Sequence, residues 1–326
     1  MTDAVTVVIP VFNGARFLGR TIASLLAQQY ERFEVICVDD LSTDDSLGVA
    51  KSFEGDSRFR VVQNDMRRGL AGNWNRAFEL ATTPLLVIAH QDDLYEPRFL
   101  AATSRLLAHH PRAFIAHARA TYLDEHDRPI DSSASRYKDR FWPDDEPYER
   151  EPAAELRVLQ NGNYIICPAA MYRMSAVAQI GAFNESYRFV PDWEYWFRGL
   201  LAGFTIAGTH ERLVGWRRHD ETATKQEETS LRRYDEELEL LTWLAREAGL
   251  PRRVDLIENT ILSDYATRLA RGDRAGAHAL HRYVRERLPE SRRNLALMRF
   301  GAIGGPVLGR TLKFAEAVYT RFAMKI

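Results

Sequence analysis

The chain has 326 residues, a formal net charge of −1 at pH 7 and 45% hydrophobic residues, which is ordinary for a globular protein with a sizeable core in one domain or two. A net charge this close to zero argues against nucleic acid as a partner of the whole molecule. Both cysteines lie in apolar runs, and neither a signal peptide at residues 1–12 nor a membrane span is visible, so the sequence predicts a cytoplasmic protein in a reducing compartment.

Short apolar runs alternate with helical patterns through the first part of the chain. The runs are typical of strands buried on both faces, and they are Val5–Val11, Phe33–Val38, Phe59–Gln63 and 85–89. A helix follows Asn13, which we place at its N-cap, and further helices are expected after residues 42–45 and over 73–81. This alternation predicts an α/β fold with a Rossmann-like, mainly parallel central sheet flanked by helices.

Acidic side chains follow two of these strands. Asp40 comes directly after the second strand, and Asp92 and Asp93 come after the apolar run 85–89. Ligands collect at the carboxyl ends of the strands in such sheets, so these carboxylates are expected to share one crevice. Two adjacent carboxylates repel each other, and a bound Mg²⁺ or Mn²⁺ relieves the repulsion and can take a diphosphate as a further ligand. The alternative is a solvated Asp-Asp turn.

The middle of the chain predicts more sheet, interrupted by one unusual segment. A helix is expected over 97–112 and strands over 114–118, 163–168, 169–172 and 213–219, with an aromatic helix after Val190. Residues 124–151 are rich in charged residues and proline and carry embedded aromatic residues. We expect a long loop here. A loop of this length inside a domain is usually functional or mobile, and we interpret it as a lid or an acceptor-side insertion.

The last hundred or so residues have purely helical patterns. Amphipathic helices are expected over 229–248, 255–271 and 273–288. The tail from Ser291 is strongly basic, with Glu316 as its acidic residue. Two interpretations stay open for it: a helix that lies on an anionic membrane surface, or one that packs on the protein with solvated arginines.

Four motifs in this order resemble the family 2 glycosyltransferases, which are inverting enzymes of GT-A fold that use nucleotide-activated sugars. The motifs are Val8–Asn13 (VIPVFN), Val38–Ser46 (VDDLSTDDS), Gln91–Leu94 (QDDL) and Ile180–Arg198 (IGAFNESYRFVPDWEYWFR). The resemblance covers roughly residues 4–222. The motifs together are specific for the fold and the reaction class, but not for the sugar.

The resemblance implies roles for the donor side of the site. Residues that line the nucleotide pocket or contact the nucleotide are Pro10, Val11, Asn13 and Asp40, with Asp92 facing the sugar or ribose. Asp93 is implied as the metal ligand. The alternative for Asp40 is a turn cap.

Asp192 matches the position of the family's catalytic base. Inversion requires a single carboxylate that takes the proton of the acceptor hydroxyl. The neighbouring Trp193 and Trp196 would partly desolvate Asp192 and so raise its pKa. Glu194 is the competing candidate, but helical spacing directs it away from Asp192. Asp192 is also a candidate N-cap after Pro191.

His219 ends a strand, as a histidine does in many relatives, and is a candidate metal ligand or diphosphate contact, although Mg²⁺ prefers oxygen. One departure from the family pattern concerns the basic residue that many relatives carry before an asparagine, because this chain has Trp74-Asn75 there. The corresponding arginine would have to be Arg68 or Arg76. We interpret His90 as a strand-end residue and not as a second metal ligand.

The sequence therefore predicts a GT-A domain over 1–224, with a donor half over about 1–97 and an acceptor half over 98–224, and a helical region over 225–326 for membrane or partner contact. The predicted reaction is inverting, metal-dependent transfer from a UDP-, dTDP- or GDP-sugar to a glycan or lipid-linked acceptor, in cell-envelope, capsule or O-antigen synthesis. The expected cofactor is Mn²⁺ or Mg²⁺. The alternatives are a sugar nucleotidyltransferase, which normally has a richer glycine loop after the first strand, and an inactive binding protein of the same fold.

Overall fold

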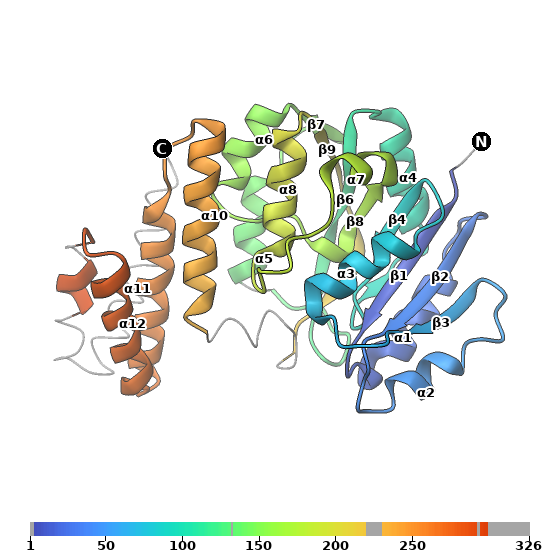
Figure 1. Ribbon diagram of the computed structural model, residues 1–326, viewed down its shortest axis with the longest axis horizontal. Coiled ribbons are helices and arrows are strands. Elements are labelled where there is room, and N and C mark those ends of the chain that lie inside the picture. The colour runs from blue at the N-terminus through green and yellow to red at the C-terminus, as the bar shows by residue number, and fades with distance from the viewer. Residues whose placement is uncertain (1–2, 132, 220–229, 292–293, 299–326) are drawn as a thin grey trace. The chain divides into compact units, whose positions relative to one another are not determined.

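The computed structural model describes residues 3–131, 133–219, 230–291 and 294–298. The chain divides into two compact units, Met1–Glu228 and Thr229–Ile326. The first unit is built on a nine-stranded sheet, and the described part of the second consists of helices (Figure 1). The donor and acceptor roles of the two halves of the first unit stay predictions.

The predicted parallel strands form one half of the sheet. β1 (Val5–Val11), β2 (Phe33–Asp39), β3 (Phe59–Gln63) and β4 (Leu85–Ile88) pair in parallel in the order β3-β2-β1-β4 (Figure 1). The apolar side chains of β1 and β4 are almost all fully buried, as expected for strands covered on both faces. The carboxyl ends of these strands therefore meet at one edge, where the acidic residues lie.

The helices between these strands are α1 (Ala15–Leu26), α2 (Ser46–Lys51) and α3 (Gly69–Leu80). The predicted N-cap is wrong by one residue, because Gly14 caps α1 and Asn13 has a left-handed φ of 51°. Asn13 instead turns the chain toward Ser42, whose Oγ accepts its backbone N–H at 3.0 Å. α3 begins earlier than expected because the Asp40 carboxylate accepts the backbone N–H groups of Arg68 and Gly69 and fixes the start of the helix.

The rest of the sheet is mixed. From β4 it continues in the order β8-β6-β9-β5, and β7 pairs with β9. These strands are β5 (Leu94–Tyr95), β6 (Ala113–Leu123), β7 (Tyr148–Arg150), β8 (Ala170–Arg173) and β9 (Thr205–Arg217). Only β6 and β9 are parallel among them. The helices of this half are α4 (Phe99–His109), α5 (Ser133–Lys138), α6 (Pro152–Leu159), α7 (Met174–Ile180) and α8 (Pro191–Leu201), with 3-10 turns η1 (Asp139–Phe141) and η2 (Cys167–Ala169).

Two expectations for this half need correction. Residues 163–168 are not a strand: they form a loop that passes into η2, because Pro168 lacks an N–H for a sheet ladder and Asn163 bonds to other side chains. Residues 124–151 are not a structureless loop either. They carry α5 and η1, and β7 pairs antiparallel with β9.

The second unit has the predicted amphipathic helices. They are α10 (Arg232–Ala248), α11 (Val254–Ala270) and α12 (Arg274–Arg287). Gly249 ends α10 in the left-handed conformation, and the Asp273 side chain caps α12 through the N–H of Gly276. Among the described residues, none of the helices has the length and apolar character that crossing a membrane requires. Most of the predicted basic tail, residues 292–293 and 299–326, lies outside the described residues.

Candidate functional site

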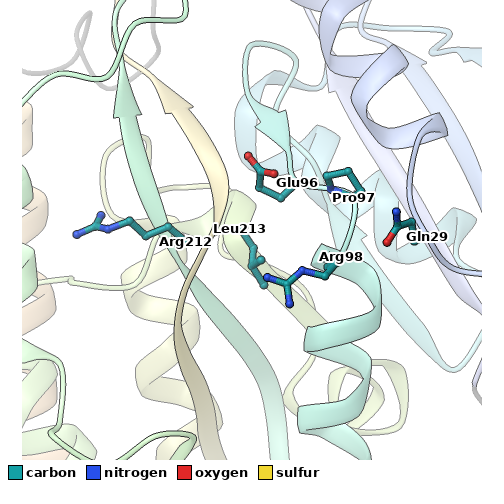
Figure 2. A pocket seen from close by; sticks show the side chains of 6 residues that line it. All are labelled: Gln29, Glu96, Pro97, Arg98, Arg212 and Leu213. Atoms are coloured by element: carbon teal, nitrogen blue, oxygen red, sulfur yellow. The ribbon is translucent and has the colours of Figure 1, made fainter.

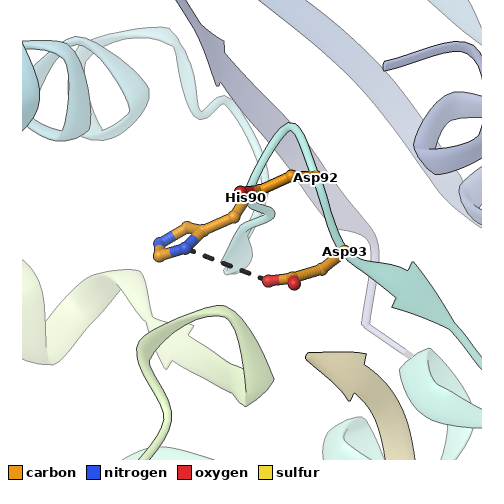
Figure 3. A group of neighbouring side chains, drawn as sticks. All are labelled: His90, Asp92 and Asp93. Carbon is orange, nitrogen blue, oxygen red and sulfur yellow. Dashed lines mark ion pairs between the residues drawn. The ribbon is translucent and has the colours of Figure 1, made fainter. Parts of the chain in front are cut away.

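The turn between β4 and β5 carries His90, Asp92 and Asp93 (Figure 3). Asp93 is fully buried, and its Oδ1 accepts the backbone N–H of Arg217 at 2.9 Å. Its Oδ2 is buried without a hydrogen-bond partner among the described residues. Nδ1 of His90 lies 4.0 Å from this Oδ2 atom. One ligand atom from each of His90, Asp92 and Asp93 lies within 4.8 Å of the others.

The electrostatics of this cluster fit a divalent cation. Burial raises the pKa of Asp93 well above its ordinary value, and the Asp92 carboxylate raises it further. Burial lowers the pKa of His90, which favours the neutral imidazole that a metal requires. An orphaned, buried carboxylate oxygen beside a second carboxylate and a neutral imidazole is a donor set suited to Mn²⁺ or a similar ion.

The two histidines lie differently from the expectation. His219 lies two residues beyond β9, and its Nε2 is 2.9 Å from Oδ2 of Asp92, not of Asp93. His90 faces Asp93, although the sequence suggested no ligand role for it. The reason is Trp74, whose ring stacks on His90 with centroids 5.6 Å apart. Trp74, at the position where the family that the sequence resembles often has a basic residue, thus holds the imidazole beside the carboxylate.

Arg217 binds the backbone of this turn, a role that the sequence analysis did not predict. It is fully buried at the end of β9. Its guanidinium donates to the backbone oxygen of Asp92 and, from Nε at 2.8 Å, to the carboxylate of Asp127. The guanidinium also lies over the Phe17 ring, 4.6 Å from its centroid. A buried arginine that is bonded this fully fixes the Asp92-Asp93 backbone.

Asp40 lies in a second buried cluster, after β2. Its Oδ1 accepts from Nδ2 of Asn64 at 2.9 Å and from the Arg68 backbone N–H at 2.8 Å. Its Oδ2 accepts from the Gly69 backbone N–H at 3.0 Å and lies 3.2 Å from Nε of Arg67. Asp39, in contrast, accepts the backbone N–H of Ser42 and acts as a turn cap.

The arginine beside Asp40 is not one of the predicted pair. The side chains of Arg68 and Arg76 both approach Glu79, at 3.4 and 2.7 Å. Arg67 instead lies over the Phe12 ring, 3.2 Å from its centroid, and reaches Asp40. The only sequence signal for Arg67 was its place in a basic turn that precedes α3.

The end of β1 connects these two clusters. The Asp40 N–H donates to the oxygen of Val11 at 2.8 Å. One residue further on, Phe12 exchanges two hydrogen bonds with the Gln91 side chain, of 2.9 and 3.2 Å. At this edge Val11 is buried and Pro10 is half-buried, whereas Asn13 is exposed and its Oδ1 accepts the Thr43 N–H. The residues predicted for the nucleotide pocket therefore lie along one sheet edge.

Asp192 lies in the first turn of α8. Its Oδ1 accepts the Trp193 backbone N–H at 2.8 Å, and its Oδ2 accepts Nδ2 of Asn163 at 2.9 Å. Burial raises the pKa of Asp192, while the charge of Lys138 lowers it. Glu194 is engaged elsewhere, since Arg198 binds its carboxylate at 2.6 Å.

Cys167 is a buried thiol whose pKa is influenced by two of the candidate site residues. Burial raises the pKa of the Cys167 thiol well above its ordinary value, and both Asp192 and Asp93 raise it further.

A separate cavity of about 280 Å³ lies elsewhere in the first unit (Figure 2). Its lining residues are Gln29, Glu96, Pro97, Arg98, Arg212 and Leu213. None of the candidate site residues lines it, and we assign it no role.

Comparisons with known proteins give a consistent result. A family model described as "Glycosyl transferase family 2" matches residues 6–181. An uncharacterized protein of Mycobacterium tuberculosis is 28% identical over 253 residues, which is 74% of this chain and 75% of the relative. A protein of Rickettsia typhi named an uncharacterized glycosyltransferase is 26% identical over 237 residues, or 71% of this chain and 69% of the relative. A Mycobacterium bovis protein named a PGL/p-HBAD biosynthesis glycosyltransferase is 28% identical over 193 residues, or 58% of this chain and 67% of the relative.

Solved structures have the same fold at low sequence identity. Residues 1–349 of S. aureus TarS, in complex with UDP-GlcNAc, align with a TM-score of 0.60 at 15% identity and cover 96% of this chain and 91% of that one. A mannosyltransferase from Pyrobaculum calidifontis, in complex with GDP-Man and Mn²⁺, aligns with a TM-score of 0.58 at 17% identity and covers 99% and 88%. The predicted GT-A fold is confirmed.

Proposed function

This chain belongs to glycosyl transferase family 2, and from that premise we propose that the enzyme transfers a sugar, with inversion and with a divalent cation, from a nucleoside-diphosphate sugar to a hydroxyl of a glycan or lipid-linked acceptor. The observation that carries the proposal is the buried Oδ2 of Asp93 beside His90, which has no hydrogen-bond partner within the described part of the chain. A buried carboxylate oxygen without a partner is costly unless a ligand satisfies it.

Asp93, Asp92 and His90 would hold the cation, and His219 would support the site through its bond to Asp92. When bound, the cation neutralises the negative charge that develops on the leaving diphosphate. Since Mg²⁺ prefers a shell of oxygen ligands, an imidazole in the set favours Mn²⁺.

Asp192 is the proposed base. It takes the proton of the acceptor hydroxyl while that oxygen attacks the anomeric carbon from the face opposite the diphosphate. Burial supports this role, because a raised pKa makes the carboxylate a stronger base. The engagement of Glu194 with Arg198 leaves Asp192 as the better candidate of the two.

The nucleotide would lie along the sheet edge formed by Pro10, Val11 and Asp40. Arg67 and Phe12 offer a cationic and an aromatic surface there for a base or a phosphate. UDP-, dTDP- and GDP-sugars are the donor candidates, and two of the aligned structures carry UDP-GlcNAc and GDP-Man. A role in cell-envelope glycan synthesis agrees with the biosynthetic name of the M. bovis relative.

The test is a panel of nucleotide sugars incubated with the enzyme and Mn²⁺, with and without glycan acceptors. Release of a nucleoside diphosphate, together with an anomerically inverted product by NMR, is the expected result. Release of pyrophosphate would show a nucleotidyltransferase instead, and binding without any product would show an inactive binding protein.

Two variants separate the roles of the carboxylates. Asp93→Ala is expected to lose metal-dependent donor binding. Asp192→Asn is expected to bind donor normally and to lose transfer by about a hundredfold to ten-thousandfold. Equal loss of donor binding in both variants would contradict the assignment.

A further inference from the structure

A lysine from the 124–151 segment reaches the proposed base through one intervening residue. Lys138 ends α5, and its Nζ donates to the backbone oxygen of Asn163. The side-chain Nδ2 of the same Asn163 donates to Oδ2 of Asp192 at 2.9 Å. Asn163 therefore joins the ammonium and the carboxylate, which lie far apart in the sequence.

We propose that Lys138 is a positioning residue for Asp192: its ammonium fixes Asn163, and Asn163 in turn holds the Asp192 carboxylate in place for the acceptor hydroxyl. The inference rests on the proposed role of Asp192 as the base. It gives α5 a function, since the segment that carries Lys138 then controls the reactivity of a residue on α8.

The charges around Asp192 support a direct effect of Lys138. Burial raises the pKa of Asp192, and the Lys138 charge is the largest influence that lowers it. The effect is mutual, because burial lowers the pKa of Lys138 to about 8 while Asp192 raises it. Opposite charges in a poorly solvated place stabilise each other in this way.

The other titratable groups near the pair do not replace this cation. Burial raises the pKa values of Cys167 on η2 and Tyr172 on β8 well above their ordinary values, and the charge of Asp192 raises both further. Both side chains are therefore neutral at the pH at which the enzyme works. The charge of Arg218, just beyond β9, lowers the pKa of Lys138 and so disfavours the protonated form of the lysine.

Asn163 also offers a hydrogen-bond acceptor beside the proposed base. Its Oδ1 is buried without a hydrogen-bond partner among the described residues. The side-chain amide is already committed to Asp192, and the backbone oxygen to Lys138. A donor such as a substrate hydroxyl would satisfy this remaining acceptor beside the base.

The first experiment measures the coupling without any acceptor. The chain has five lysines, so NMR of protein labelled with ¹³C at lysine Cε gives few signals, and Lys138→Arg identifies that of Lys138. In the unchanged protein this signal is expected to titrate near pH 8. In Asp192→Asn, loss of the carboxylate charge is expected to lower the Lys138 pKa by about one unit. An identical Lys138 titration in both proteins, or titration near the ordinary value of about 10.4, would overturn the proposal.

The second experiment is the pH profile of transfer with the donor found in the panel. Without the ammonium the Asp192 pKa rises, so in Lys138→Met the acidic limb of kcat moves to higher pH while KM for the donor is unchanged. The unchanged protein also loses rate above about pH 8, where Lys138 gives up its proton. Lys138→Met lacks this basic limb, and Lys138→Arg moves it to higher pH.

A matched control comes from the same helix. Arg136 is exposed and pairs with Asp131 at 2.6 Å, so Arg136→Met is expected to keep the profile of the unchanged protein. If Lys138→Met has that same profile while Asp192→Asn is inactive, the positioning role is refuted and the base assignment stands. If Asp192→Asn transfers sugar normally, the base assignment itself fails.

Discussion

One carboxylate oxygen of Asp93 is buried and has no hydrogen-bond partner among the residues that the structure describes, while the other accepts the backbone N–H of Arg217. Leaving such a group unsatisfied costs about 1–3 kcal/mol, or more when it is charged. Arg217 and the chain around it hold the residue in this environment, which suits a site that a cation completes.

We therefore expect Mn²⁺ to stabilise the enzyme through Asp93. At a Mn²⁺ concentration about a hundred times Kd, binding adds about 2.7 kcal/mol, which raises Tm by roughly 5 °C or more. Asp93→Asn should lose this rise and show no broadening of the Mn²⁺ signal in EPR titrations. Asp56→Asn, which alters an aspartate paired with Arg58, is the control and should respond as the unchanged protein does. A full Mn²⁺ response in Asp93→Asn would remove Asp93 from the ligand set.

The arginines before and in α3 give the second prediction. Arg67 contacts both Phe12 and Asp40, whereas Arg68 and Arg76 pair with Glu79. Arg67→Ala should weaken nucleoside-diphosphate binding about tenfold, which corresponds to roughly 1.4 kcal/mol. Arg76→Ala should change it less than twofold. Isothermal titration measures nucleotide binding by the unchanged protein and the two variants, and the opposite order of effects would support the assignment made from the sequence.

At the scale of elements, α8 lies against β6 through a glycine. A Cβ at Gly199 would overlap the ring of Phe114, so only glycine allows this approach. Gly199→Ala gains up to about 1 kcal/mol of helix propensity but costs about 1–3 kcal/mol by overpacking, and the cost should prevail. Urea unfolding should show lower stability for this variant. Gly55→Ala, where the added Cβ meets nothing within 4 Å, is the control and should change little.

A buried polar network connects β6, β7 and α6. Nε2 of His117 is 2.6 Å from the Tyr148 hydroxyl, which is 2.9 Å from that of Tyr164, and Tyr164 donates to Glu155 at 2.7 Å. Burial, together with the charges of Arg150 and Lys138, lowers the pKa of His117 to about 3. The imidazole is therefore neutral in the folded protein throughout the range in which it titrates when unfolded.

This network predicts a pH dependence of stability. The contribution of His117 is fully present above its unfolded pKa of about 6.5 and is lost as pH falls toward 3. Between pH 7 and 5 the loss amounts to about 2 kcal/mol. His117→Gln should unfold in urea with a correspondingly smaller pH dependence over this interval, while the exposed His109→Gln should keep the original one. A slope unchanged by His117→Gln would contradict the assignment.

At the scale of the whole molecule, the described contacts of the candidate site all come from the first unit. Asp40, Asp93 and Asp192 are bonded to residues between Val11 and Arg217. We propose that the helical second unit serves acceptor, membrane or partner contact and not the donor site.

The expected outcome is that residues 1–228, expressed alone, bind the donor nucleotide with an affinity within about threefold of the full chain. Circular dichroism and thermal unfolding check that the fragment is folded, and isothermal titration measures the binding. A folded fragment that has lost the nucleotide would assign part of the donor site to the second unit.

The sequence determined much of the fold because its signals are local. The β-branched runs and amphipathic spacings of the first ninety or so residues set the strands and helices of the parallel half, and strand ends identified Asp40 and Asp93. The predicted boundary of a helix was wrong where a side chain distant in the sequence sets it, as Asp40 does for the start of α3. The prediction of a strand over 163–168 was wrong, because Asn163 binds the side chains of Lys138 and Asp192 and does not pair with a neighbouring strand.

Only the tertiary structure decided which side chains meet. The bond between His219 and Asp92 joins residues 127 positions apart, and Lys138 reaches Asp192 through Asn163. The side chain of Arg67, and not that of Arg68 or Arg76, reaches the Asp40 carboxylate, and Trp74 stacks on His90 beside Asp93. Periodicity encodes which face of an element is buried, but it carries no information on which distant side chain that face will contact. The partners of a charge are fixed when the elements pack, and the packing sets the burial and the neighbouring charges that tune each group.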